Sequence, residues 1–422
     1  MTNKKFTTET QRHRDFSKTA SRIKLFKLLC FSLCLCVSVV ISSLKAKAQL
    51  AVRGETVWTM AGEPIRNGVV LIGANGKIEA VGAANQVRIP QNYKTVSAKV
   101  VTPGLIDAHS VIGLAGYLNQ PHDQMQIDTS NPFQPDLRAF DAYNPEEKLI
   151  EWVRGFGVTT LHTGHAPAAL VSGQTMIVKT FGKTVDDVLI APTAMIAVTI
   201  GEGGLAGQGR SPGTRAKQAS MLRAELVKAG NYKGEPRDLK VEMMSRVVKR
   251  EIPLLVTAHR AQDIMTALRI AKEFNLRIVL DGASEAHLVI NEIKASGFPV
   301  IIHPTMYRAG GELESLSMET ASKLKQAGIP VALQSGYETY VPKTRVVLFE
   351  AGVAAANGLS MRDALATITI DAAKILGIDN RVGSLEKGKD GDVAMYDGDP
   401  FEYTTHCTGT IINGQVVSEV VR

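Results

Sequence analysis

The middle of the chain alternates short, fully apolar runs with segments of helical periodicity. Four such runs are "IPLLVTAH" (252–259), "LRIVLDG" (276–282), "FPVIIHPT" (298–305) and "IPVALQSG" (329–336). Strands that are apolar on both faces are buried on both, which predicts a parallel sheet covered by helices. About eight strand–helix units over roughly 270 residues predict an α/β fold with a closed (β/α)8 TIM-like barrel, whose active site forms at the C-terminal strand ends.

Both ends of the chain after residue 48 contain short alternating runs joined by turn sequences. "GANGK" at 73–77 and "NG" at 413–414 are hairpin signals between apolar residues. We expect the two ends to pair into one small composite β-sandwich. The expected domains are therefore the first part of the sandwich at 49–100, a (β/α) barrel at 101–377 and the second part of the sandwich at 378–422.

Residues 1–48 have the composition of an export signal. A basic region precedes an uncharged, mostly apolar run at 28–44, and Ala46-Lys47-Ala48 matches the small-x-small cleavage pattern. We expect export to the periplasm or the extracellular space; the alternative is an uncleaved membrane anchor at 28–44. Three of the four cysteines lie in this segment, so cleavage would leave Cys407 without a partner for an intramolecular disulfide.

The formal net charge of +7 belongs to this leader. Ten of the 48 Lys and Arg residues and two of the 41 Asp and Glu residues lie in 1–48, so the remainder carries a net charge of −1. A nucleic-acid-binding surface needs basic charge on the folded part. The composition therefore argues against a nucleic-acid partner and leaves a small molecule as the expected ligand, with homo-oligomer formation open.

Histidines gather at the predicted strand ends. In a barrel these positions converge on one mouth, and imidazole is both a metal ligand and a general acid or base near neutral pH. The histidines after residue 48 that lie in loop-like or helical sequence, and are expected to be structural, are His122, His287 and His406. The five that follow an apolar run, and together predict a functional pocket, are His109, His162, His165, His259 and His303.

The run "PGLIDAHSVIG" at 103–113 carries part of a metal-binding pattern. Residues two apart on a strand point to the same side, so a histidine at position 111 would lie beside His109 and complete a pair of ligands. Val111 stands there instead, and its side chain does not bind a metal. The run is therefore interpreted as a metal-site strand that lacks one ligand.

Four segments together resemble the amidohydrolase superfamily, in particular its imidazolonepropionase-like branch. They are "VVTPGLIDAHS", "GVTTLHTG", "IPLLVTAHRAQDIMTALRIAKEF" and "DAAKILGIDNRVGSLEKGKDGDVAMYDGDP". The resemblance covers nearly all of the chain after residue 48. It implies a barrel with a composite β-sandwich, hydrolysis of carbon–nitrogen bonds other than peptide bonds, and one or two divalent metals that activate the attacking water.

The resemblance, carried over residue by residue, implies an incomplete metal site. His109 matches the first-strand histidine, His259 matches the fifth-strand histidine, and Asp281 stands where a sixth-strand histidine is expected. Glu202 in "VTIGEGG" is placed as the bridging ligand, with a plain loop carboxylate as the alternative. A catalytic zinc usually keeps three protein ligands and a water, so at most one divalent metal, zinc by preference, is expected per chain.

The usual proton acceptor of the family is also changed. The eighth-strand aspartate position falls in "VALQSGY", where the chain has Gln334 and Ser335. No residue is assigned as the catalytic base. His303 and His162 are the candidate substitutes, and His165 and Gln334 are expected to line the pocket. General-base catalysis contributes about 10²–10⁴ in rate, so the change bears directly on activity.

Two functions are therefore open. One is a hydrolase of carbon–nitrogen bonds with a mononuclear metal site, and the other is a catalytically inactive barrel that serves as an exported binding or scaffold protein. The segments 164–182 and 201–215 are expected near the barrel mouth. The glycines of the second are not a dinucleotide motif, because "RSPG" follows them instead of a helix start. Arg210 and Arg215 in this segment are candidates for holding an acidic ligand, with a solvated loop as the alternative.

Overall fold

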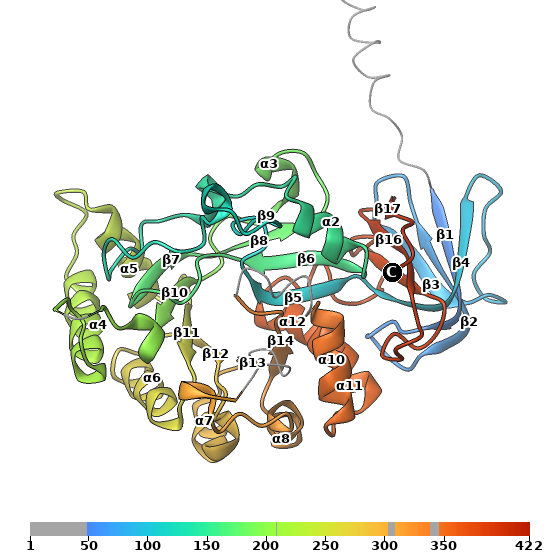
Figure 1. Ribbon diagram of the computed structural model, residues 1–422. Coiled ribbons are helices and arrows are strands. Elements are labelled where there is room, and N and C mark those ends of the chain that lie inside the picture. The colour runs from blue at the N-terminus through green and yellow to red at the C-terminus, as the bar shows by residue number, and fades with distance from the viewer. Residues whose placement is uncertain (1–48, 208, 303–308, 338–345) are drawn as a thin grey trace, which may run out of the picture. The chain divides into compact units, whose positions relative to one another are not determined.

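The computed structural model describes residues 49–422 except 208, 303–308 and 338–345. The predicted leader at 1–48 and the candidate base His303 lie outside the described residues. The described strands form three sheets of seven, six and four strands (Figure 1). In this part of the chain no helix is long and apolar enough to cross a membrane.

The seven-stranded sheet joins the two ends of the described chain, in the order β17-β16-β15-β4-β1-β2-β3. Strand β4 pairs antiparallel with β15, and Pro103 lies opposite Val393. The turn between β16 and β17 has Asn413 and Gly414 at φ values of +48° and +72°, as a two-residue hairpin prefers. The strands are β1 (Leu50–Val57), β2 (Ile65–Ile72), β3 (Ile78–Ala83), β4 (Lys94–Pro103), β15 (Val393–Tyr396), β16 (Cys407–Ile412) and β17 (Gln415–Ser418).

The six-stranded sheet has the order β14-β13-β12-β11-β10-β7. Strands β10 to β14 pair in parallel and are buried along their length, as their apolar sequences predicted. Strand β7 pairs with β10 in the antiparallel direction. The strands are β7 (Val171–Gln174), β10 (Ile196–Thr199), β11 (Leu254–Ala258), β12 (Ile278–Gly282), β13 (Val300–Ile302) and β14 (Val331–Leu333).

The four-stranded sheet has the order β5-β6-β8-β9. Strands β5 and β6 are parallel, whereas β8 runs antiparallel to both of its neighbours. The strands are β5 (Leu105–Ser110), β6 (Val158–Thr163), β8 (Met176–Lys179) and β9 (Leu189–Ala191).

The six- and four-stranded sheets meet at two places. Thr175 alone separates β7 from β8, so one bent stretch pairs with β10 in one sheet and with β6 in the other. At the other end a single bridge joins Ser110 of β5 to Gly336 beyond β14. The predicted α/β class is confirmed. The described strands do not form the closed parallel barrel as one sheet, because the stretch 171–179 runs antiparallel.

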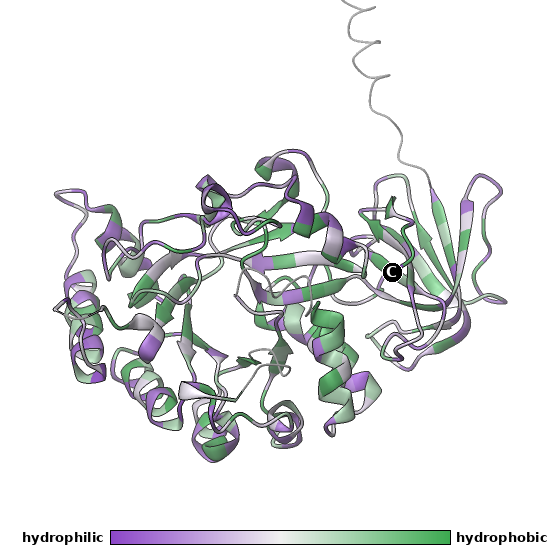
Figure 2. Ribbon diagram, in the orientation of Figure 1, coloured by the Kyte–Doolittle hydropathy of each residue, from purple (hydrophilic) through white to green (hydrophobic). Residues whose placement is uncertain are grey.

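Helices lie around the outside of strands β10 to β14 (Figure 1). In α6, Ile264, Ala267, Leu268 and Ala271 are buried on one face at helical spacing. Figure 2 shows hydrophobic residues along the inner strands and mixed character on the surrounding helices. The helices are α2 (Lys148–Arg154), α3 (Val185–Val188), α4 (Arg215–Gly230), α5 (Leu239–Val248), α6 (Ala261–Glu273), α7 (Ile290–Ser296), α8 (Thr320–Gln326), α10 (Val347–Ala356), α11 (Met361–Thr367) and α12 (Ile370–Ile375). Short 3-10 turns are η1 (Pro121–Asp123), η2 (Ala139–Asp141), η3 (Glu202–Gly204), η4 (Ala286–Leu288) and η5 (Gly311–Leu313).

Candidate active site

A pocket of about 300 Å³ lies at the C-terminal ends of β10, β11 and β14, and we call it the strand-end pocket. Thr199 and Thr257 contribute from within strands β10 and β11. The other polar side chains that line it follow strand ends or lie in short 3-10 turns. They are Glu202, His259, Glu312 and Tyr337. In the barrel that the sequence predicts, active sites form at the C-terminal strand ends.

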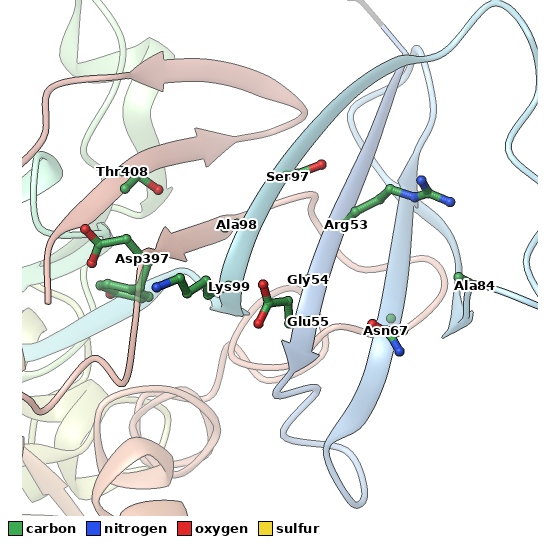
Figure 3. A pocket seen from close by; sticks show the side chains of 12 residues that line it. Arg53, Gly54, Glu55, Asn67, Ala84, Ser97, Ala98, Lys99, Asp397 and Thr408 are labelled. Atoms are coloured by element: carbon green, nitrogen blue, oxygen red, sulfur yellow. The ribbon is translucent and has the colours of Figure 1, made fainter.

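A larger hollow of about 670 Å³ lies on the seven-stranded sheet (Figure 3). Charged side chains of both signs line it, among them Arg53, Glu55, Lys99 and Asp397. None of the described residues that the sequence selected for the site is among its lining residues. We therefore place the candidate active site in the strand-end pocket, where an imidazole is present as an acid–base group.

His259 follows directly on β11 and lines the strand-end pocket. Its Nδ1 is hydrogen-bonded to Ser284 Oγ at 2.9 Å and its Nε2 to Tyr337 Oη at 2.8 Å. Gly282, the last residue of β12, has a φ of +73°, and a Cβ there would lie 2.6 Å from the His259 ring. Glycine at this position therefore allows the imidazole to pack closely against β12.

His109 is buried near the end of β5. Its Nδ1 is hydrogen-bonded to Asp281 Oδ1 at 2.9 Å, while its Nε2 is buried and has no hydrogen-bond partner among the described residues. Its ring centroid lies 5.7 Å from that of His162 and 6.0 Å from that of Tyr337. Metal-binding histidines commonly donate their second ring nitrogen to a carboxylate. His109 has this arrangement, so it is a candidate metal ligand.

Asp281 accepts hydrogen bonds on both of its carboxylate oxygens. Besides the contact with His109, Gln334 Nε2 donates to Oδ1 at 2.8 Å and Thr257 Oγ1 donates to Oδ2 at 2.6 Å. The Asp281 side chain is fully buried, and a buried charge requires partners of this kind. Asp281 is thus the acceptor of an internal network and does not line the strand-end pocket.

Ser335, where the family resemblance implies an aspartate, faces Asp107 of β5. Ser335 donates to the Asp107 carboxylate from its backbone nitrogen at 3.0 Å and from its hydroxyl at 2.5 Å. Burial raises the pKa of Asp107 to about 6, and the hydrogen bonds from Ser335 oppose that shift. The pair links β5 to the residues beyond β14, and neither residue lines the pocket.

His162 and His165 are buried outside the pocket lining. His162 Nδ1 donates to the carbonyl oxygen of Ala108 at 2.6 Å, and its Nε2 is hydrogen-bonded to Thr175 Oγ1 at 2.6 Å. Burial first, and then the neighbouring His109, lower the pKa of His162 to about 3. Burial also lowers the pKa of His165, whose ring nitrogens lack a hydrogen-bond partner in the part of the chain that is described. Both rings are therefore neutral near pH 7.

The rim of the pocket carries the carboxylates of Glu202 and Glu312. Glu202 is exposed, and its backbone nitrogen donates to Glu312 Oε1 at 2.9 Å. Arg215 forms ion pairs with Glu312 and with Asp263, and its Nε lies 2.9 Å from Asp263 Oδ1. Arg210 lines a separate hollow of about 140 Å³. Neither arginine is among the residues that line the pocket.

Val111 belongs to a small apolar cluster beside the pocket. It is fully buried and packs with Ala115, Ala166 and the ring of Tyr337. The spacing to His109 predicts a histidine at position 111. Val111 stands there and forms part of an apolar surface that contacts Tyr337.

The predicted ligands, as the structure places them, do not fit a divalent metal. Within the described ranges, no group of three or more His, Cys, Asp or Glu side chains is arranged to hold a metal ion. Asp281 is engaged inside the fold, Glu202 lies on the exposed rim, and both ring nitrogens of His259 are hydrogen-bonded. Among the described residues considered as ligands, His109 is left as the one candidate.

Comparisons with known proteins identify the family. Residues 240–418 match the model of an amidohydrolase family. The structure of an amidohydrolase from Thermotoga maritima MSB8 superimposes with a TM-score of 0.82 at 29% sequence identity, over 88% of this chain and 100% of that chain. These matches support the amidohydrolase superfamily as the family of this chain. The resemblance read from the sequence is thereby confirmed.

Two curated relatives agree with the assignment to the amidohydrolases. Amidohydrolase tasK of Hapsidospora irregularis is 22% identical over 416 residues, which cover 83% of this chain and 41% of that protein. The imidazolonepropionase of Syntrophobacter fumaroxidans is 37% identical over 79 residues, which cover 18% of this chain and 19% of that protein. The chain thus spans less than half the length of the curated relatives that it matches.

Sequence reasoning did not select Tyr337, Ser284 or Glu312 for this amidohydrolase site. Tyr337 directly follows the strand-end sequence "LQSG", and that position was a signal for an aromatic hydroxyl near the end of β14. Glu312 lies between β13 and α8 in η5, where no motif marks it. The structure brings His259, Glu202 and Tyr337 to one pocket and His109, Asp281 and Gln334 to one buried network.

Proposed function

We propose that this amidohydrolase-superfamily protein hydrolyses a carbon–nitrogen bond, other than a peptide bond, of a small molecule bound in the strand-end pocket. The observation that carries the proposal is the place of His259. It follows β11, where the family pattern has its fifth-strand histidine, and its ring lines the pocket. The volume of about 300 Å³ is at the lower end of the range for small-ligand sites, which favours a small substrate such as a cyclic amide.

Zinc, one ion per chain, is the cofactor that the family resemblance implies, and it would supply an activated water. The described residues do not fit this ion, so the proposal assigns no step to it. We also propose that the six- and four-stranded sheets act as the family barrel. The bent stretch at Thr175 and the Ser110–Gly336 bridge support that arrangement. Export of the protein remains a proposal from the composition of residues 1–48.

The test is a turnover assay on the full-length protein, purified without chelator and with its metal content measured by elemental analysis. A panel of cyclic amides, such as hydantoin and dihydrouracil, and of N-acyl amino acids is incubated with the protein, and products are identified by mass spectrometry. We expect turnover of at least one compound. His259→Ala should lower it by about 10²–10⁴, the range for loss of an acid–base group.

His406→Ala is the matched control, because His406 is exposed and hydrogen-bonded to Asp397 away from the pocket lining. It should leave turnover unchanged. Failure of the wild-type protein to convert any compound of the panel, or full activity of His259→Ala, would reject the proposal.

Binding without turnover is the second candidate, and one observation favours it. Asp281 and Ser335, at two positions where the family has catalytic groups, are hydrogen-bonded inside the fold. The same panel separates the two functions. A compound that raises the melting temperature and is recovered unchanged supports binding, whereas a compound that is consumed supports hydrolysis.

A further inference from the structure

We infer that Tyr337 and His259 act together as the proton-transfer pair of the strand-end pocket. The inference rests on the proposed function and names the groups that perform it. Three features carry it: the 2.8 Å hydrogen bond between the two side chains, the pocket that both of them line, and the packing that holds the tyrosine in place.

The hydrogen-bonded chain runs from Ser284 through His259 to Tyr337. A neutral imidazole has one donor and one acceptor nitrogen. When Nδ1 donates to Ser284 Oγ at 2.9 Å, Nε2 accepts the proton of the Tyr337 hydroxyl. Ser284 is itself buried, so the ring is held in one orientation. A hydroxyl beside a base, with the base oriented by a third group, is the arrangement that activates hydroxyls in enzymes.

The position of Tyr337 depends on the change at Val111. The tyrosine ring packs against the apolar cluster of Val111, Ala115 and Ala166. Valine is smaller than histidine and brings no polar atom, so it provides an apolar surface for the ring. The loss of the expected second histidine and the presence of a tyrosine hydroxyl on His259 therefore belong to the same rearrangement of the site.

The charges around the pocket favour a positive imidazole while the proton is on it. Glu202 and Glu312 line the same pocket, and no lysine or arginine does so among the described residues. An opposite charge nearby stabilises the charged form of a titratable group. Arg215 offsets part of this effect, because it is paired with Glu312.

The step that we assign is balanced in protons and electrons. A water attacks the carbonyl carbon of the bound substrate and the carbon–oxygen bond forms. The water proton passes to the Tyr337 oxygen while the Tyr337 proton passes to His259 Nε2. When the carbon–nitrogen bond breaks, both transfers reverse and the leaving nitrogen takes up the proton. One water is consumed, the two side chains return to their starting state, and no oxidant or reductant is needed.

A tyrosine-directed reagent tests the pair without knowledge of the substrate. 4-(2-Aminoethyl)benzenesulfonyl fluoride transfers its sulfonyl group to a tyrosine oxygen: the sulfur–oxygen bond forms, fluoride leaves, and the phenol proton passes to a base. The full-length protein is treated at neutral pH, and labelled peptides are followed over time by mass spectrometry. We expect labelling of Tyr337 to be at least about tenfold faster in the wild type than in His259→Gln.

Tyr403 is the internal control, because its side chain is fully exposed and should be labelled equally in both proteins. Tyr337→Phe is the second variant, since phenylalanine keeps the ring on the Val111 cluster and removes only the hydroxyl. It should lower kcat for any converted compound by about 10² or more with little change in KM.

The outcomes separate the inference from the proposed function. Equal labelling rates of Tyr337 in wild type and His259→Gln would overturn the inference that the two residues transfer protons together. An unchanged kcat in Tyr337→Phe would overturn it as well. Labelling that depends on His259, without conversion of any compound in the panel, supports the pair and rejects the hydrolase function. Circular dichroism of both variants establishes that the fold is kept.

Discussion

The surroundings of His259 and of His109 differ, although the family pattern places both histidines in one metal site. His259 lines a pocket and has two hydroxyl partners, Ser284 and Tyr337. His109 is buried against the carboxylate of Asp281, within a network that Thr257 and Gln334 complete. We call these regions the pocket half and the buried half of the site.

The difference is one of solvent access: His109 and Asp281 are buried, whereas His259 lines a pocket. In the buried half each polar group is desolvated, so removal of one partner leaves several others unsatisfied. In the pocket half the groups reach solvent or a ligand. Substitutions there should lower the free energy of unfolding less and the activity more. Substitutions in the two halves should therefore differ in how much they lower the free energy of unfolding.

Asp281→Ala should have the largest effect on stability. It leaves buried donors on His109, Thr257 and Gln334 without their acceptor, and we expect a loss of about 3–5 kcal/mol in the free energy of unfolding. Urea denaturation followed by circular dichroism measures it. Asp281→Asn keeps one acceptor oxygen and should lose less.

The matched comparison is His259→Ala in the pocket half, for which we expect a loss of only about 1–2 kcal/mol, because water can reach its partners from the pocket. A larger loss of stability in His259→Ala than in Asp281→Ala would contradict the division into two halves.

Asp107, which is buried on β5 two residues before His109, gives the stability of the protein a pH dependence. Burial raises the folded-state pKa of Asp107 to about 6 from an ordinary value of 3.8, so between these values the folded protein binds more protons than the unfolded protein. The stability contribution is fully present below about pH 4 and is lost as the pH rises through 6. The difference between the folded-state and ordinary pKa of Asp107 corresponds to about 3 kcal/mol in the free energy of unfolding.

Asp107→Asn removes this titration and keeps an acceptor for Ser335. The free energy of unfolding of the wild type, measured in urea from pH 4 to pH 7, should fall by up to about 3 kcal/mol relative to that of the variant. Parallel curves for the two proteins would show that Asp107 is not the source of the pH dependence.

Val111→His tests whether one residue restores the metal site. The larger polar ring must enter a fully buried apolar cluster and displace Tyr337, which costs about 1–3 kcal/mol. We expect no bound zinc by elemental analysis, because Asp281 stays engaged with its three partners. One zinc per chain in this variant would mean that the buried half is a metal site that lacks only its second histidine. Val111→Leu is the control for size.

The sequence predicted the fold well where hydrophobicity alone decides it. The apolar runs that end near His259 and Asp281 are the parallel strands β11 and β12, as expected for apolar strands of a parallel sheet covered by helices. The direction of 171–179 was not predicted. Its short apolar runs suit a strand in either direction, and the pairing with β6 and β10 depends on contacts distant in sequence.

The site was less predictable, because the role of a polar residue depends on its partners. His162 lies at a strand end like His259, yet its nitrogens bind Ala108 and Thr175 and it is neutral inside the fold. Strand position does not distinguish the two histidines. The hydrogen bond between His259 and Tyr337 joins residues 78 positions apart, and no local pattern encodes it.

The rim carboxylates should show the smallest effects on stability. Glu202 is exposed, so Glu202→Gln should change the free energy of unfolding by no more than about 0.5 kcal/mol. Glu312→Gln weakens an ion pair with Arg215 and should cost about 1 kcal/mol or less. Both changes should nevertheless alter the affinity for a panel compound, measured by calorimetry, because both side chains line the pocket. Unaltered affinity in both variants would mean that the ligand does not contact Glu202 or Glu312.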